Sequence, residues 1–157
     1  MSKQYLNNKW CVRCERKEPT PYLRKNIKLF PKNGIVLDVG CGNGRNSIFM
    51  KKNNYDVVLV DMINDFGKKI ILGKDKLPKN NFDIILANFI FMFLNKKERK
   101  QVFKQIQLNS KIETIMVVEL YNAKDAFECN IDDIIHFFYN WEKIRKSKDK
   151  CILKKVF

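Results

Sequence analysis

The feature that most constrains the fold is an apolar segment that ends in closely spaced glycines. Residues 34–40 read Gly-Ile-Val-Leu-Asp-Val-Gly and predict a buried strand. Gly40, Gly42 and Gly44 form a turn after it, and residues 45–53 read as a helix. Glycine permits a positive φ and lets a ligand approach the backbone closely. The order of strand, glycine-rich turn and helix therefore predicts a Rossmann-like unit that binds a nucleoside.

Two carboxylates stand beside this turn in the sequence. Asp38 lies at the end of the first strand, where it can accept hydrogen bonds or meet a cation. Asp61 ends a second apolar strand, residues 55–61, about twenty residues further on, where an acid is placed to hold a ribose diol. This order, a strand, a turn, a helix, a second strand and then an acid, is a far more specific sign of a nucleoside site than the glycines alone.

The rest of the chain alternates strands with helices. Further strands are predicted at residues 70–72, 82–87 and 112–120, helices at 22–30, 96–108 and 131–139, and a closing hairpin at 141–145 and 151–156. This pattern predicts an α/β fold with a mostly parallel sheet, an antiparallel C-terminal edge hairpin and helices on both faces.

Composition limits the class of protein. The chain has 157 residues, which suits one domain, and no apolar run approaches the roughly 18 to 20 residues of a membrane span. The N-terminal residues lack the apolar core of a signal peptide, so we expect a cytoplasmic protein without a membrane partner. Five cysteines and one histidine argue against a disulfide framework and a multi-histidine site, and we expect no metal.

The net charge of +14 bears on partners rather than on fold. Such an excess attracts polyanions such as nucleic acid. It also follows from a composition rich in Lys, Asn, Ile and Phe, as A/T-rich genomes encode. The basic residues are spread along the chain, and no Arg/aromatic recognition motif accompanies them. We therefore expect a small-molecule acceptor and keep nucleic acid open as a partner.

Several segments resemble a known family. Residues 36–44, Val-Leu-Asp-Val-Gly-Cys-Gly-Asn-Gly, resemble the first motif of class I S-adenosylmethionine-dependent methyltransferases, and residues 44–47, Gly-Arg-Asn-Ser, resemble the tellurite-resistance methyltransferase group. Residues 18–23, 82–86, 91–94 and 138–143 add weaker matches. The resemblance implies a Rossmann-like methyltransferase fold, with residues 31–157 as a single domain that binds S-adenosyl-L-methionine (SAM) and residues 1–30 as an N-terminal segment or lid.

The resemblance also implies roles for individual residues. The backbone of Gly40, Gly42 and Gly44 would pass under the methionine part of SAM, with Asp38 near its amino group and Asp61 on the ribose hydroxyls. The other implied cofactor contacts are Arg45 and Asn46 at the start of the first helix, Met62 on adenine, Asn88 and Phe89 at the sulfonium end, and Asp75 in place of a displaced acid after the third strand.

The chemistry of methyl transfer suggests further candidates. Transfer from a sulfonium is an in-line displacement, so a soft nucleophile needs no general base, whereas an oxygen or amine benefits from one. The catalytic candidates are Asn88, Glu119 and Tyr121, at the carboxyl ends of two strands. For Glu119 and Tyr121 the alternative is packing at the sheet edge.

The function predicted first is SAM-dependent methyl transfer to a small molecule or soft anion. One alternative is a nucleic-acid (DNA/RNA) methyltransferase that docks through its basic surface. Another is a non-catalytic SAM-binding partner subunit, since the segment between Asp61 and Ile70 is short for the usual helix. We expect a monomer or a homodimer.

For three further features we favour a structural role over a functional one. Cys11 and Cys14 form one CxxC pair, which cannot complete a tetrahedral zinc site, so we expect a surface or lid segment that also carries Tyr5 and Trp10. Residues 89–93 are expected to be mainly core and pocket wall. His136 lies in an apolar helical run and is expected to be partly buried and hydrogen-bonded.

Overall fold

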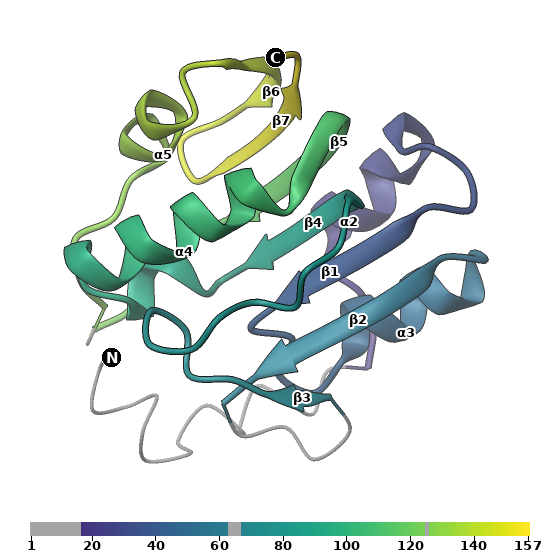
Figure 1. The fold of residues 1–157 in the computed structure, drawn as a ribbon, viewed down its shortest axis with the longest axis horizontal. Coiled ribbons are helices and arrows are strands. Elements are labelled where there is room, and N and C mark those ends of the chain that lie inside the picture. Colours follow the sequence, from purple (N-terminus) through teal and green to yellow (C-terminus); the bar gives the residue numbers. More distant parts are fainter. Residues whose placement is uncertain (1–16, 63–66, 125) are drawn as a thin grey trace.

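The computed structural model describes residues 17–62, 67–124 and 126–157 (Figure 1). In these ranges the chain forms a seven-stranded sheet in the order β3-β2-β1-β4-β5-β7-β6. The strands are β1 (Ile35–Val39), β2 (Asp56–Asp61), β3 (Lys68–Lys69), β4 (Phe82–Asn88), β5 (Ser110–Glu119), β6 (Trp141–Lys146) and β7 (Lys150–Lys155). The helices are α2 (Pro21–Asn26), α3 (Arg45–Lys52), α4 (Lys96–Leu108) and α5 (Ile131–Phe137), with 3₁₀ turns η2 (Ile27–Leu29) and η3 (Phe91–Phe93).

The strand directions match the prediction. β1 pairs in parallel with β2 and β4, β2 pairs in parallel with β3, and β4 pairs in parallel with β5. β7 lies antiparallel between β5 and β6. The mostly parallel sheet with an antiparallel C-terminal hairpin is therefore confirmed. The carboxyl ends of β1, β2, β4 and β5 meet at one end of the sheet, which we call the carboxyl edge.

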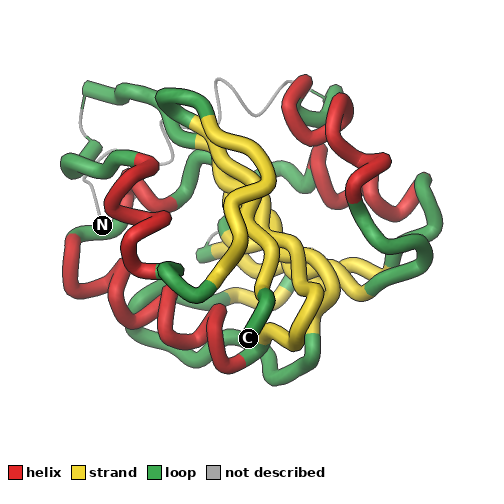
Figure 2. Tube along the Cα trace, turned by 90° about the horizontal axis from the view of Figure 1, so that it is seen from above, coloured by secondary structure: helices red, strands yellow, loops and turns green. Residues whose placement is uncertain are grey.

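Helices cover both faces of the sheet, with α4 and α5 on one side and α2 and α3 on the other (Figure 2). Successive strand residues point to opposite faces. Leu37 and Val39 of β1 therefore belong to the core cluster under α4 and α5, and Val36 belongs to the cluster under α2 and α3. Leu23 and Met50 are fully buried and anchor α2 and α3 on that face. Burial on both faces explains why the strands read as nearly continuous apolar runs.

Helix α4 begins and ends where the sequence predicts. Asn95 caps it, since its side chain accepts from the Glu98 N–H (3.0 Å) while the Glu98 carboxylate accepts from the Asn95 N–H (2.8 Å). Val102, Phe103 and Ile106 share the face that is buried against the sheet. The spacing of these apolar residues was sufficient to predict the buried face.

The predicted strand at residues 70–72 is wrong. The strand at that edge is Lys68–Lys69, which pairs with Val60 and Asp61. The N–H of Ile70 still donates to the Asp61 carbonyl (2.9 Å), but the chain then turns and Gly73 adopts a φ of +82°. Ile70 and Leu72 are apolar because they are buried in the core under α4 and α5, without joining the ladder of strand hydrogen bonds.

The predicted N-terminal segment is described in part. Residues 21–29 form α2 and η2, and Leu23 and Phe30 enter the core. The predictions for Tyr5, Trp10 and the Cys11/Cys14 pair lie outside the described residues. Among the residues that are described, no helix has the length and apolar character needed to cross a membrane.

Candidate functional site

The turn at residues 40–44, here called the glycine turn, lies at the carboxyl edge directly after β1. Gly40, Gly42 and Gly44 have φ values of +70°, +55° and +74°, which other residues adopt only with strain. The N–H of Gly40 donates to the Val60 carbonyl (2.8 Å), and the N–H of Gly44 donates to the Cys41 carbonyl (2.9 Å). The turn is therefore tied to β2 and closed on itself.

Two of these glycines differ in the space around them. A Cβ atom on Gly40 would lie 2.5 Å from Cγ1 of Ile90, so a side chain there would collide with the core. A Cβ atom on Gly42 would meet no atom of the described residues within 4 Å, and Gly42 is exposed. Within the described part of the chain, nothing fills the space above Gly42, so a ligand could approach the backbone there.

Asp61 lies beside this space, as the spacing predicts. Its carboxylate, which is 2% exposed, accepts a hydrogen bond from the Gly42 N–H (2.8 Å). The next residue, Met62, is partly buried and packs against the core cluster under α4 and α5. The structure therefore joins the acid at the end of β2 to the glycine turn, with an apolar side chain next to it.

Asp38 is a buried carboxylate at the end of β1. It accepts a hydrogen bond from the Ser47 hydroxyl at the start of α3 (2.6 Å). The pKa of Asp38 is raised to about 6, first by burial and then by the nearby Asp61 carboxylate, against the lowering effects of the Ser47 hydrogen bond and the Arg45 charge. A perturbed carboxyl group at this position favours a cationic ligand, because a positive charge would relieve the cost of ionising it.

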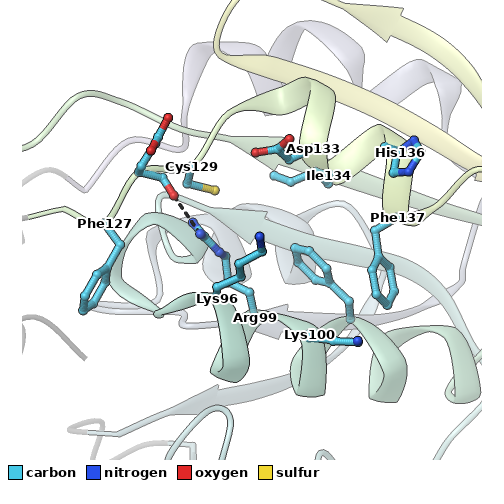
Figure 3. A pocket seen from close by; sticks show the side chains of 11 residues that line it. Lys96, Arg99, Lys100, Phe127, Cys129, Asp133, Ile134, His136 and Phe137 are labelled. Atoms are coloured by element: carbon cyan, nitrogen blue, oxygen red, sulfur yellow. Dashed lines mark hydrogen bonds between the residues drawn. The ribbon is translucent and has the colours of Figure 1, made fainter.

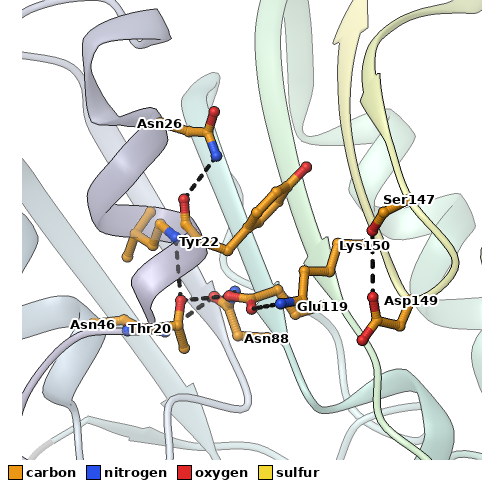
Figure 4. A network of polar contacts seen from close by, with 10 residues as sticks. Thr20, Tyr22, Asn26, Asn46, Asn88, Glu119, Ser147, Asp149 and Lys150 are labelled. Carbon is orange, nitrogen blue, oxygen red and sulfur yellow. Dashed lines mark hydrogen bonds and ion pairs between the residues drawn. The ribbon is translucent and has the colours of Figure 1, made fainter.

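Four buried polar side chains from α3, β4, β5 and the cap of α2 meet at the carboxyl edge (Figure 4). They are Thr20, Asn46, Asn88 and Glu119, here called the Thr20 cluster. The Thr20 N–H donates to Asn46 Oδ1 (2.9 Å), Asn46 Nδ2 donates to Asn88 Oδ1 (3.1 Å), and Asn88 Nδ2 donates to Glu119 Oε1 (2.8 Å). The Thr20 hydroxyl donates to the same Oε1, which closes a ring of hydrogen bonds.

Glu119 is the charged member of this ring and is 1% exposed. Burial raises its pKa, while its contacts to Thr20, Lys150 and Asn88 act in the opposite direction. Lys150 Nζ lies 3.8 Å from Glu119 Oε2. The structure therefore brings the predicted residues Asn46, Asn88 and Glu119 together, and directs their polar atoms toward one another.

Thr20 is a site residue that our reading of the sequence did not identify. It caps α2, because its hydroxyl oxygen accepts from the Leu23 N–H (3.3 Å). A threonine followed by Pro21 is a helix-start signal, which would have placed Thr20 at a cap. That signal reveals the cap but not the contact with Glu119, which lies 99 residues away in the sequence.

Two aromatic residues lie next to the Thr20 cluster. Phe89 follows β4 with a φ of +59°, and its N–H donates to the Glu119 carbonyl (2.7 Å). A positive φ is unusual for a bulky residue and such strain concentrates at functional sites. The Phe89 and Tyr121 rings meet edge to face with centroids 5.4 Å apart. Residues 91–93 are buried, which agrees with their predicted role as core, and Tyr121 N–H contacts Met92 Sδ (3.3 Å).

Two predicted residues remain, Asp75 and Arg45. Asp75 is exposed, and its carboxylate accepts from the Ile71 N–H (2.8 Å) within its own turn, while its carbonyl accepts from Gln105 Nε2 of α4 (3.2 Å). Arg45 begins α3, and its N–H donates to Asn43 Oδ1 (3.2 Å). Burial raises the pKa of both buried carboxyl groups of the site, Asp38 and Glu119, and the positive charge of Arg45 acts to lower it. No group of three or more potential metal ligands occurs among the described residues.

Comparisons with known proteins agree with this geometry. The family model for "Tellurite resistance protein TehB" matches residues 23–155. TehB from Haemophilus influenzae superposes with a TM-score of 0.75 at 16% identity, over 93% of this chain and 65% of that one. A TehB-like SAM-dependent methyltransferase from Corynebacterium glutamicum gives 0.71 at 17% identity, over 97% of each chain. No curated protein sequence matches this chain.

A third similar structure contains ligands. It is the 1,6-didemethyltoxoflavin-N1-methyltransferase of Burkholderia thailandensis with bound 1,6-didemethyltoxoflavin and S-adenosylhomocysteine, with a TM-score of 0.74 at 10% identity, over 98% of this chain and 84% of that one. At such identities the likeness shows the fold, which is that of SAM-dependent methyltransferases. The chain spans less than two thirds of the Haemophilus protein (65%).

Proposed function

The chain belongs to the TehB family of tellurite resistance proteins, and from this premise we propose that it is a SAM-dependent methyltransferase acting on a small molecule or soft anion. The observation that carries the proposal is the meeting of the glycine turn with Asp61. The Gly42 N–H donates to the Asp61 carboxylate at 2.8 Å, and no described residue fills the space above Gly42. That is the arrangement expected for a nucleoside held at the carboxyl edge of a parallel sheet.

The residues present fit SAM. Asp61 would bind the ribose hydroxyls, Met62 would contact adenine, and Gly42 leaves space for the methionine part. Asp38 is a buried carboxylate whose raised pKa suits a neighbouring ammonium group. When bound, SAM supplies a methyl group that is already activated on sulfonium.

The Thr20 cluster bears on the acceptor. Glu119 Oε1 accepts two hydrogen bonds and Oε2 faces Lys150, so taking up a substrate proton would disturb the ring. An acceptor that must lose a proton benefits from a general base, whereas a thiolate, selenide or telluride does not. The cluster therefore favours a soft anion, with Asn88 and Glu119 as positioning residues.

The walls beside the cluster fit the same chemistry. In-line methyl transfer depends mainly on positioning and on the exclusion of water. The Phe89 and Tyr121 rings provide an apolar boundary next to Asn88 at the carboxyl edge. We expect these rings to shield the sulfonium end of the donor.

The formal charge of +14 supports a second candidate, a nucleic-acid methyltransferase that docks through its basic surface. Salt-dependent retardation of DNA or RNA in a gel would favour this candidate, and no binding at low salt would exclude it. The cytoplasmic location and the monomeric or homodimeric state are further expectations, which cell fractionation and light scattering would test.

The experiment that tests the first proposal is calorimetric titration of the chain with SAM and with S-adenosylhomocysteine. We expect one site per chain for each. Incubation with SAM and hydrogen selenide should then yield methaneselenol, detected by mass spectrometry of the headspace. Failure of both nucleosides to bind would contradict the proposal. Binding without turnover on selenide, sulfide or a cell extract would instead support a non-catalytic partner subunit.

A further inference from the structure

We propose that a groove between α4 and residues 127–137 binds a small aromatic anion, and none of its described lining residues belongs to the glycine turn or the Thr20 cluster. The groove has a volume of about 650 Å³, within the usual range for small-molecule sites (Figure 3). α4 forms one wall, and the segment leading into α5, with α5 itself, forms the other. We call it the α4–α5 groove. This proposal does not depend on the proposed methyltransferase function.

One wall of the groove carries three cationic side chains. Lys96, Arg99 and Lys100 are spaced three and four residues apart on α4, so they share one face of the helix. None of the three forms an ion pair with a carboxylate in the part of the chain that the structure describes. An anion in the groove would therefore not have to displace an existing salt bridge.

Arg99 is the residue best placed to bind the anion. Its Nη2 donates to the carbonyl of Glu128 (2.7 Å), which ties the guanidinium on α4 to the backbone of the opposite wall (Figure 3). The guanidinium also lies beside the Cys129 thiol in the groove, where burial raises the pKa of that thiol against the lowering effect of the Arg99 charge. A guanidinium held in the wall of a groove attracts an anionic group, and carboxylate and sulfonate oxygens form strong charge-assisted hydrogen bonds with it.

The rest of the groove is apolar and aromatic. Phe103 and Phe137 pack with ring centroids 5.0 Å apart, and Ile134 is buried beside them. Phe127 is 39% exposed at the other end. A flat aromatic ring is the group that such a surface accommodates best, because aromatic pairs gain from edge-to-face and offset contacts.

The acidic residues of the groove limit the charge of the ligand. Glu128 and Asp133 also line it, so the three cations are partly balanced by two carboxylates. Asp133 is engaged locally, since its N–H and carboxylate both contact the Asn130 side chain (2.8 and 3.0 Å). Among the described lining residues, these cations exceed the carboxylates by one charge, which favours a ligand with a single anionic group over a polyanion such as nucleic acid.

The test is a fluorescence titration of the full chain with 8-anilino-1-naphthalenesulfonate, an aromatic anion. We expect one saturable site, and at least tenfold weaker binding by Arg99→Leu. Lys104→Ala is the matched control, because Lys104 is an exposed cation of α4 outside the groove. Its affinity should stay within twofold of that of the unmodified chain.

Three further measurements make the test decisive. Lys100→Glu changes an exposed residue and leaves the Glu128 contact intact, so it should weaken binding even if Arg99→Leu does not fold. The uncharged analogue N-phenyl-1-naphthylamine should bind at least tenfold more weakly than the sulfonate. Saturating S-adenosylhomocysteine should not displace the probe. Equal binding of the two dyes, displacement by the nucleoside, or unchanged affinity in the Lys100 variant would each overturn the proposal.

Discussion

Replacing Asp38 by Asn should raise the stability of the protein at neutral pH. Its pKa is raised from an ordinary 3.8 to about 6, mainly by burial. At 1.36 kcal/mol per pKa unit, ionising the folded chain at this position costs about 3 kcal/mol. Asparagine can still accept the Ser47 hydrogen bond, but its amide also introduces a donor that needs a partner. We therefore expect Asp38→Asn to increase the free energy of unfolding at pH 7 by about 1 to 3 kcal/mol.

The dependence on pH identifies the cause. Well below pH 4 the carboxyl group is protonated in both the folded and the unfolded chain, so the folded state carries no penalty. Because the folded pKa is the higher one, the stability of the unmodified protein relative to Asp38→Asn should fall between about pH 4 and pH 6.5 and then stay constant. Urea unfolding of both proteins across this range measures the difference.

The matched control is Asp56→Asn, which removes an exposed carboxylate from the neighbouring strand β2. It should change the free energy of unfolding by less than about 0.5 kcal/mol at every pH. If the gap between Asp38→Asn and the unmodified protein does not change between pH 4 and pH 7, our account of Asp38 is refuted.

The remaining predictions concern the cofactor and the Thr20 cluster. Asp61→Ala should weaken SAM binding at least tenfold in calorimetry while the chain stays folded, and unchanged affinity would contradict the placement of the ribose. Gly42→Val should abolish SAM binding because its side chain would fill the space above the turn; binding comparable to that of the unmodified chain would show that the turn is not the cradle. SAM binding at pH 6 should release up to about half a proton from Asp38, which is half-protonated at that pH, and the release is seen as a heat that varies with buffer ionisation; a heat independent of the buffer would argue against an ammonium group there. Thr20→Val should lower the free energy of unfolding by about 2 to 4 kcal/mol, since it removes a helix cap and a hydrogen bond to a buried carboxylate, whereas Thr20→Ser should cost less than about 1 kcal/mol; equal losses would refute the role of the hydroxyl.

Local sequence patterns predicted most of the fold. Helix α4 was predicted with its bounds because a cap at Asn95 and an apolar face at Val102, Phe103 and Ile106 agree. Strand β3 was misplaced because it is two residues long and carries only lysines, whereas Ile70 and Leu72 are buried without being a strand. Burial alone does not distinguish a strand from a buried turn.

The part of the site that follows from the order of strands and turns along the chain could be predicted from the sequence. The Asp61 contact with Gly42 follows from the succession of strand, turn and strand. The ring through Thr20 joins side chains that lie 26 to 99 residues apart, and no local pattern specifies such pairs. His136 was expected to be partly buried, and this was wrong: it is exposed on the α4–α5 groove, and the apolar neighbours Phe137 and Phe138 misled the assignment.

The hydrogen bond between Thr20 and Glu119 has a consequence for folding during synthesis. Thr20 leaves the ribosome 99 residues before its acceptor, an interval of about 5 to 20 seconds at usual rates of synthesis. During that interval this hydrogen bond cannot stabilise α2, and the apolar side chain of Leu23, which is buried in the folded protein, is not yet covered by the rest of the core. α2 is thus synthesised early but gains this hydrogen bond late. In nascent chains halted before residue 119, α2 should therefore be cleaved by proteases that the complete protein resists.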